Sequence, residues 1–276
     1  MNVDLHCHSN MSDGALPPAE VARRAARAGV QVWALTDHDE LGGLEEARDA
    51  AITEGMRFVA GVEISVTWRG GTIHIVGLRI DPGNAALTAG LAQVRGGRLA
   101  RARAIAEDLA RSGVDGSLEG ALARAENPAM VGRTHFARYL VEQGHVADTR
   151  DAFRRYLVPG KPGYVPHQWA VLGDAVRWIR AAGGQAVLAH PGRYGYSAGA
   201  LDSLLQAFRE AGGEAIEVVT GSHSTEQARL FAAVAHQYDL LASRGSDFHG
   251  PEEGAEFGTL PPLDPALRPV WRHWGL

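Results

Sequence analysis

The chain has 276 residues, of which 45% are hydrophobic and 21% charged, as in ordinary soluble globular proteins, and it is long enough to bury a sizeable core. A single cysteine excludes an internal disulfide framework, and the lack of any run of 18 apolar residues excludes a transmembrane helix. The net charge is −5, although residues 93–163 carry 11 arginines and Lys161, the one lysine of the chain, against 8 acidic residues, an excess suited to an anionic substrate.

Strand and helix patterns alternate from the N-terminus onward. The first strand begins within three residues of Met1, which leaves no room for a signal peptide, and we expect a cytoplasmic protein with no membrane or duplex-DNA partner. Strands are predicted at 3–9, 30–39, 57–68, 71–80, 185–193, 215–222 and 240–250. Helices are predicted at 17–29, 42–55, 85–111, 173–184, 201–213 and 224–239.

This order predicts an α/β fold. Repeated strand-helix units favour a parallel sheet with helices outside it, and the segment "RGGT" predicts a hairpin between the third and fourth strands. About seven strands with polar residues at their C-terminal ends favour a barrel related to the (β/α)₈ kind. We expect the barrel at 1–92 and 169–276, and a small helical insertion that covers the substrate at 93–168.

Two histidines stand one residue apart in the first strand, within "DLHCHSNMSDG". Because alternate side chains of a strand share a face, His6 and His8 point the same way and Cys7 points the opposite way, as a small buried residue. Asp247 and His249 repeat this spacing in "GSDFHG". Two imidazoles on one face suit a metal better than a packed core.

Imidazoles and carboxylates follow or lie on most of the predicted strands. The candidate metal ligands are His6, His8, Asp13, His38, Glu63, His74, His190, Asp247 and His249. Nine nitrogen and oxygen donors are too many for one ion, and they predict two or three divalent cations with a bridging carboxylate. Without thiolates, the set favours Mn²⁺ first, with Zn²⁺ or Fe²⁺ as alternatives. Asp37 and Asp39, beside His38, are interpreted as groups that support the ligands or the loop.

At this point the chain resembles the PHP (polymerase and histidinol phosphatase) phosphoesterases. The motifs "HCHS", "SDG", "TDHD", "GVEIS", "IHIVG", "AHPGR" and "GSDFH" occur in family order over almost the whole chain. The resemblance implies a distorted (β/α)₇ barrel of the TIM-like PHP type. It also implies three metal sites, formed by His6, His8, Glu63 and Asp247, by Asp13, His38 and His249, and by Glu63, His74 and His190.

The insertion is similar to that of the 3′,5′-nucleoside bisphosphate phosphatases, through "NPAMVGRTHFARYLV", "YLVPGKPGYVPHQWA", "GGRLARAR" and "GSHS". This resemblance implies a hydrolase that removes the 3′-phosphate from a small nucleotide such as 3′-phosphoadenosine 5′-phosphate. Alternatives with the same metals are a 5′→3′ exoribonuclease on short 5′-phosphorylated RNA and a histidinol-phosphate or sugar-phosphate phosphatase. A barrel without catalysis that serves as a binding module, or an amidohydrolase, are further alternatives.

Phosphate ester hydrolysis requires a nucleophile and compensation of charge on the phosphoryl oxygens. We expect a metal-bound hydroxide as the nucleophile, with His223 as candidate general acid, worth about 10²–10⁴ in rate; a helix-capping role for His223 is the alternative. Residues expected to bind the substrate are Arg98, Arg101, Arg133, Thr134, His135, Lys161, Gln168 and Arg193, in addition to His223. Arginine can hold a second phosphate with a bidentate fork, and Gln168 with Trp169 could contact a base.

Overall fold

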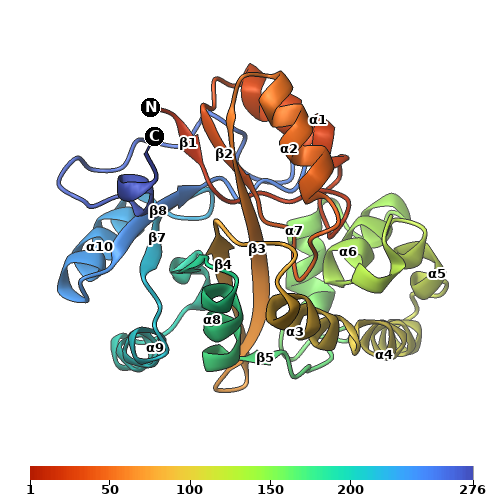
Figure 1. Ribbon diagram of the computed structural model, residues 1–276. Coiled ribbons are helices and arrows are strands. Elements are labelled where there is room, and N and C mark those ends of the chain that lie inside the picture. The colour runs from red at the N-terminus through yellow and green to blue at the C-terminus, as the bar shows by residue number, and fades with distance from the viewer. Residues whose placement is uncertain (276) are drawn as a thin grey trace.

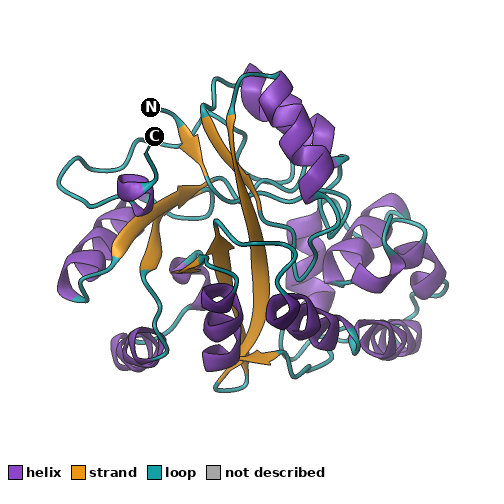
Figure 2. Ribbon diagram, in the orientation of Figure 1, coloured by secondary structure: helices purple, strands orange, loops and turns teal. Residues whose placement is uncertain are grey.

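The computed structural model describes residues 1–275 and contains one curved sheet with helices packed outside it (Figures 1 and 2). The strands are β1 (Val3–Asp4), β2 (Val32–Leu35), β3 (Arg57–Trp68), β4 (Gly71–Leu78), β5 (Ala170–Val171), β6 (Gln185–Leu188), β7 (Ala215–Thr220) and β8 (Leu241–Gly245). Seven of them follow the order β1-β2-β3-β4-β6-β7-β8, and β5 pairs with β3. The first and last strands meet, since Leu5 N donates to Arg244 O at 3.0 Å and His8 N donates to Phe248 O at 2.8 Å. The fold is therefore a nearly closed α/β barrel, which confirms the predicted fold class.

The barrel is mixed, whereas the repeated strand-helix units predicted a parallel sheet. β4 runs antiparallel to both β3 and β6, and the other pairings are parallel. The cause is the predicted hairpin after Trp68. Arg69 and Gly70 both have positive φ, 47° and 81°, as a two-residue type I′ turn requires. This turn reverses the chain within the sheet, where a crossover helix would have kept it parallel.

The helices alternate with the strands and then accumulate on one side. They are α1 (Pro18–Arg27), α2 (Leu44–Thr53), α3 (Ala85–Arg95), α4 (Arg98–Arg111), α5 (Ser117–Leu122), α6 (Arg133–Glu142), α7 (Thr149–Ala152), α8 (Leu172–Ala181), α9 (Ala198–Glu210) and α10 (Thr225–Gln237). Short helical turns are η1 (Pro128–Met130), η2 (Phe153–Leu157), η3 (Pro191–Tyr194) and η4 (Val270–His273). Capping residues mark where some of the helices begin. Asn84, for example, caps α3 by accepting hydrogen bonds from the amides of Ala86 and Leu87.

Two apolar clusters build the barrel. The larger lies between the sheet and the outer helices and includes Cys7 and Trp33, in keeping with the predicted orientation of that thiol. A smaller cluster contains Val59 and Val76, which share strand faces with Glu63 and His74, and Val270 from η4. Apolar side chains therefore fill part of the barrel interior, and the polar side chains concentrate beside them.

Helices α4 to α7 form their own apolar cluster on one side of the barrel (Figure 1). Ile105, Leu109, Phe136, Leu140 and Leu157 are buried in it. Between Leu78 and Ala170 the chain forms helices and turns only. Within the described residues, no helix combines the length and apolarity needed to cross a bilayer.

Candidate metal centre and substrate pocket

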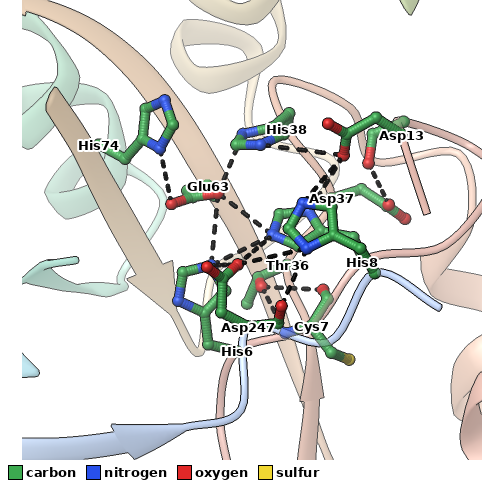
Figure 3. A network of polar contacts seen from close by, with 12 residues as sticks. His6, Cys7, His8, Asp13, Thr36, Asp37, His38, Glu63, His74 and Asp247 are labelled. Atoms are coloured by element: carbon green, nitrogen blue, oxygen red, sulfur yellow. Dashed lines mark hydrogen bonds and ion pairs between the residues drawn. The ribbon is translucent and has the colours of Figure 1, made fainter. Parts of the chain in front are cut away.

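The predicted donors meet at one end of the barrel, around Glu63 (Figure 3). His6, His8 and Asp13 follow β1, His38 follows β2, and Glu63 and His74 face each other across β3 and β4. His190 follows β6, and Asp247 with His249 follows β8. The structure thus brings together all nine side chains that the sequence singles out as ligands.

The first group of donors is formed by His6, His8, Glu63 and Asp247, the set implied by the resemblance. Glu63 Oε2 lies 3.3 Å from Nε2 of both histidines. Asp247 Oδ1 lies 3.2 Å from His8 Nε2 and 3.5 Å from His6 Nε2. Two imidazole nitrogens and two carboxylate oxygens therefore point at a common centre.

The second group adds His8 to the expected Asp13, His38 and His249. Asp13 Oδ1 is 3.4 Å from His249 Nε2 and 3.9 Å from both His38 Nε2 and His8 Nδ1. His8 therefore presents one ring nitrogen to each of the first two groups. Strand alternation predicts the side on which His8 lies but not that both of its nitrogens face donors.

Glu63 connects these groups to a third. Its Oε1 lies 2.9 Å from His190 Nε2 and 3.0 Å from His74 Nδ1, and its Oε2 lies 2.9 Å from His38 Nδ1. His38 thus joins the expected pair of His74 and His190 around this carboxylate. One fully buried glutamate contacts five imidazoles in total.

The donor set fits divalent cations. Within the described chain, His8 Nδ1, Asp13 Oδ1, His38 Nδ1, Glu63 Oε2 and His190 Nδ1 are buried atoms without a hydrogen-bond partner. Buried polar groups are rarely left so, and a bound ion would satisfy several of them at once. Hard oxygen and imidazole donors without thiolate match Mn²⁺, Fe²⁺ or Zn²⁺.

The electrostatics of the site also call for positive charge. Burial opposes protonation of His8, but hydrogen bonds to Asp247 and Glu63 raise its pKa to about 10. Burial likewise opposes ionisation of Glu63, yet His74, His38 and His6 hold its pKa well below the usual range. The carboxylates are therefore ionised and attract cations, whether protons or metal ions.

Three further carboxylates support the site from behind. Asp37 accepts from Ser9 N at 2.7 Å and so holds loop backbone, whereas Asp39 accepts from Ser65 N at 2.8 Å and holds the backbone of β3. Both contacts are in keeping with the expected supporting role of these residues. Glu217 in β7 was missed by the sequence analysis, although an acidic residue within the apolar run "AIEVVT" is a signal that could have revealed it. It contacts His6 and the backbone of His190.

A pocket opens over the donors and is bounded by the helical segment. Arg98, Arg101, Arg133, Thr134 and Arg193 line it, and all five are among the residues expected to contact substrate. The pocket also contains Ser12, Ser65, Thr72, Met130, Gly132, Phe153 and Trp169 in addition to seven of the candidate ligands. Thr134 Oγ1 donates to Asp13 Oδ2 at 2.8 Å, which links the start of α6 to a candidate ligand.

The pocket arginines differ in how their charge is balanced. Arg98 pairs with Asp39, and Arg193 Nη1 lies 2.5 Å from Asp247 Oδ2. Arg101 and Arg133 each donate to a backbone carbonyl, of Val165 and Leu157, and no ion pair joins either to an acidic residue of the described chain. Burial and then the neighbouring guanidinium groups lower the pKa of Arg101 to about 10. Two partly buried cations without counter-ions favour an anionic ligand.

Four residues expected to contact substrate do not line this pocket. Lys161 and Gln168 are exposed, and His135 is buried within the helical segment. His223 Nδ1 faces Val218 O at 3.0 Å, and its Nε2 accepts from Gly192 N–H at 3.0 Å. Both ring nitrogens are occupied by backbone groups, so this geometry does not support His223 as a general acid. It instead holds the loop that carries Arg193.

The burial of His135 predicts that the protein loses stability at low pH. Its Nδ1 accepts from Gly132 N–H at 3.1 Å, and burial lowers its pKa from 6.5 to about 4. The unfolded chain protonates this imidazole near pH 6.5, and the folded chain protonates it only near pH 4. The stability that neutral, buried His135 contributes should therefore be complete above pH 6.5. It should then fall by about 3 kcal/mol as the pH drops toward 4.

Urea denaturation of the wild type and His135→Gln between pH 4.5 and 7.5 would measure this effect. The difference in unfolding free energy should shrink or reverse toward low pH. His236→Gln, which removes an exposed imidazole from α10, is the matched control and should not reproduce the trend. A difference that stays constant with pH would contradict the assignment.

Comparisons with known proteins agree with this geometry. A family model described as PHP domain matches residues 4–158. The chain is 53% identical to the 3′,5′-nucleoside bisphosphate phosphatase of Chromobacterium violaceum. This similarity extends over 273 residues, which are 99% of this chain and 96% of the relative. It is 43% identical to the 5′-3′ exoribonuclease Rnm of Salmonella typhimurium, with coverage of 98% and 93%. A solved structure of an amidohydrolase from Chromobacterium violaceum with bound sulfate matches with a TM-score of 0.96 at 52% identity, covering 99% of this chain and 95% of that one.

Proposed function

The chain belongs to the PHP domain family, and from this premise we propose that it hydrolyses the 3′-phosphate of 3′,5′-nucleoside bisphosphates, such as 3′-phosphoadenosine 5′-phosphate, to a nucleoside 5′-monophosphate and phosphate. One observation carries the proposal. The pocket combines a cluster of cation-binding donors with two arginines that lack counter-ions. It therefore offers two separate places for phosphate, which a 3′,5′-bisphosphate would fill and a plain sugar phosphate would not.

The first phosphate would lie over the donor cluster. His6, His8, Glu63 and Asp247 would hold one ion, and Asp13, His38 and His249 a second. Glu63 with His74 and His190 would complete a third site. We favour Mn²⁺ for these sites, with Zn²⁺ or Fe²⁺ as alternatives. When bound, such ions place positive charge at the phosphoryl oxygens and activate water as the nucleophile.

The residues around the donors orient the substrate. Arg193 lines the pocket beside Asp247 and would donate to an oxygen of the reacting phosphoryl group. Thr134 keeps Asp13 turned toward its group of histidines through the 2.8 Å hydrogen bond. Because a misplaced ligand or phosphate lowers the rate steeply, both contacts would contribute by positioning.

The second phosphate would bind Arg101 and Arg133. Both guanidinium groups face the pocket, and their backbone hydrogen bonds leave further N–H groups free for a ligand. Arg98, already paired with Asp39, would serve mainly to support the loop of His38. We propose that residues 93–168, which supply these arginines, form a substrate-binding cap beside the barrel at 1–92 and 169–276; their separate apolar cluster supports this division.

Phosphate release from a panel of esters tests the proposal. With added Mn²⁺, a 3′,5′-bisphosphate should be hydrolysed faster than the 3′-monophosphate and the 5′-monophosphate of the same nucleoside, and faster than histidinol phosphate. The cause is that only the bisphosphate engages both the donor cluster and the unpaired arginines. Preference for histidinol phosphate or another sugar phosphate would reject the substrate assignment.

A second candidate activity, 5′→3′ hydrolysis of short 5′-phosphorylated RNA, is favoured by one feature of the surface. A further groove shares Thr134, Phe153, Arg193 and His249 with the pocket, and continues between residues 148–150 and 252–254. A nucleotide attached to the reacting phosphate could leave along this groove. Including a 5′-phosphorylated dinucleotide in the panel distinguishes the two activities, since an enzyme restricted to mononucleotides would not cleave it.

A further inference from the structure

Glu217, in the middle of β7, is a buried carboxylate that lies behind the candidate metal centre. Its exposed fraction is 1%, and it does not line the substrate pocket. Its neighbours in the strand, Ile216, Val218 and Val219, are apolar. Placing a charge there is costly unless strong hydrogen bonds compensate it, so its partners are informative.

The two oxygens of Glu217 hold two of the candidate ligands. Oε1 lies 2.7 Å from His6 Nδ1. Since an ionised carboxylate only accepts hydrogen bonds, His6 must carry its proton on Nδ1. The lone pair of His6 Nε2 is then turned toward Glu63, Asp247 and His8, which lie 3.3, 3.5 and 3.2 Å away. Glu217 thus selects the tautomer in which His6 can bind a cation.

The other oxygen acts on the backbone of the chain. Oε2 accepts the N–H of His190 at 2.6 Å. His190 has φ of +25°, a region that residues with a side chain rarely adopt, so its backbone needs external support. This conformation directs His190 Nε2 to Glu63 Oε1 at 2.9 Å. A single side chain on β7 therefore supports ligands that follow β1 and β6.

We propose that Glu217 is a positioning residue of the metal centre, which sets the tautomer of His6 and the backbone of His190 so that both present Nε2 to a divalent cation. The inference rests on the metal centre of the proposed function, but not on the identity of the substrate. Hydrogen-bond partners of this kind typically affect metal affinity 10- to 100-fold when they are removed.

The substitution Glu217→Gln tests the assignment with almost no change of shape. Both partners of Glu217 are donors, and an amide offers one acceptor and one donor. The variant must therefore either push His6 into the tautomer protonated on Nε2 or leave the N–H of His190 unpaired. Calorimetric titration with Mn²⁺ should show a dissociation constant about 10- to 100-fold higher for at least one site. Glu214→Gln is the matched control, since Glu214 also carries a carboxylate hydrogen-bonded within this region, to Gln185 Nε2 at 3.1 Å, but contacts no candidate ligand.

A merely structural role has a different signature. In that case the melting temperature of the metal-free protein would fall while the Mn²⁺ dissociation constant stayed within about twofold of the wild type, and the inference would be overturned. If Glu217→Gln does not fold, Glu217→Asp is measured in the same way, because the shorter side chain cannot reach both donors; unchanged Mn²⁺ affinity there also overturns it. Weakened Mn²⁺ binding supports the inference even if the ester panel rejects the bisphosphate substrate, so the two failures are distinguishable.

Discussion

Replacing Glu63 with glutamine is expected to abolish phosphate release, with a loss of about 10³-fold or more. The reason is the central position of this side chain. Its two oxygens lie within 3.3 Å of five imidazoles, and it belongs to two of the three donor groups. Glutamine keeps the shape but removes the negative charge and replaces one acceptor with a donor, so it cannot bridge cations.

The measurement combines activity with metal content. Mn²⁺ bound per chain, counted by atomic absorption after gel filtration, should fall together with the rate, and chelation of the wild-type protein should reproduce the loss until Mn²⁺ is restored. Glu45→Gln makes the same chemical change on the exposed face of α2 and should leave both quantities unchanged. A Glu63→Gln protein with full metal content and near wild-type turnover would refute the metal centre.

Replacing Arg133 or Arg101 is expected to change the preference for the bisphosphate substrate but to leave the rate of the chemical step nearly unchanged. Charge-assisted hydrogen bonds contribute about 1.5–3 kcal/mol each, so alanine at either position should lower kcat/KM for the 3′,5′-bisphosphate by about 10- to 100-fold. Turnover of the 3′-monophosphate, which has no second phosphate, should change by less than about threefold. The effect should appear mainly in KM, because this phosphate does not react.

Lys161→Ala is the control for this experiment. The rarity of lysine in the sequence made Lys161 a candidate phosphate contact, but the structure places it on the surface outside the pocket. The bisphosphate should therefore be hydrolysed normally by this variant. Equal losses on both substrates in Arg133→Ala would mean that the arginine supports the fold or the reacting phosphate, which would contradict the clamp for a second phosphate.

The sequence alone located the candidate metal ligands, because their positions follow from short-range rules. Strand alternation places His6 and His8 on one face and Cys7 on the other, and the strands of a barrel bring their polar ends together. The two-glycine segment at residues 70–71 predicted the hairpin for the same reason, since the turn depends on local backbone geometry. Such features need no knowledge of distant contacts.

Only the tertiary structure decided how these donors are grouped and which polar residues line the pocket. Neither the two-sided contacts of His8 nor the hydrogen bonds of Glu217 follow from spacing. The contacts of Glu217 with His6 and of His8 with Asp247 join side chains that lie more than 200 residues apart in the sequence. In the helical segment, Thr134 turns toward Asp13 while its neighbour His135 turns into the cap, since successive residues of a helix point about 100° apart. Residue type predicts which side chains are candidates. The rotation of each helix and its packing on the barrel determine which of these candidates line the pocket.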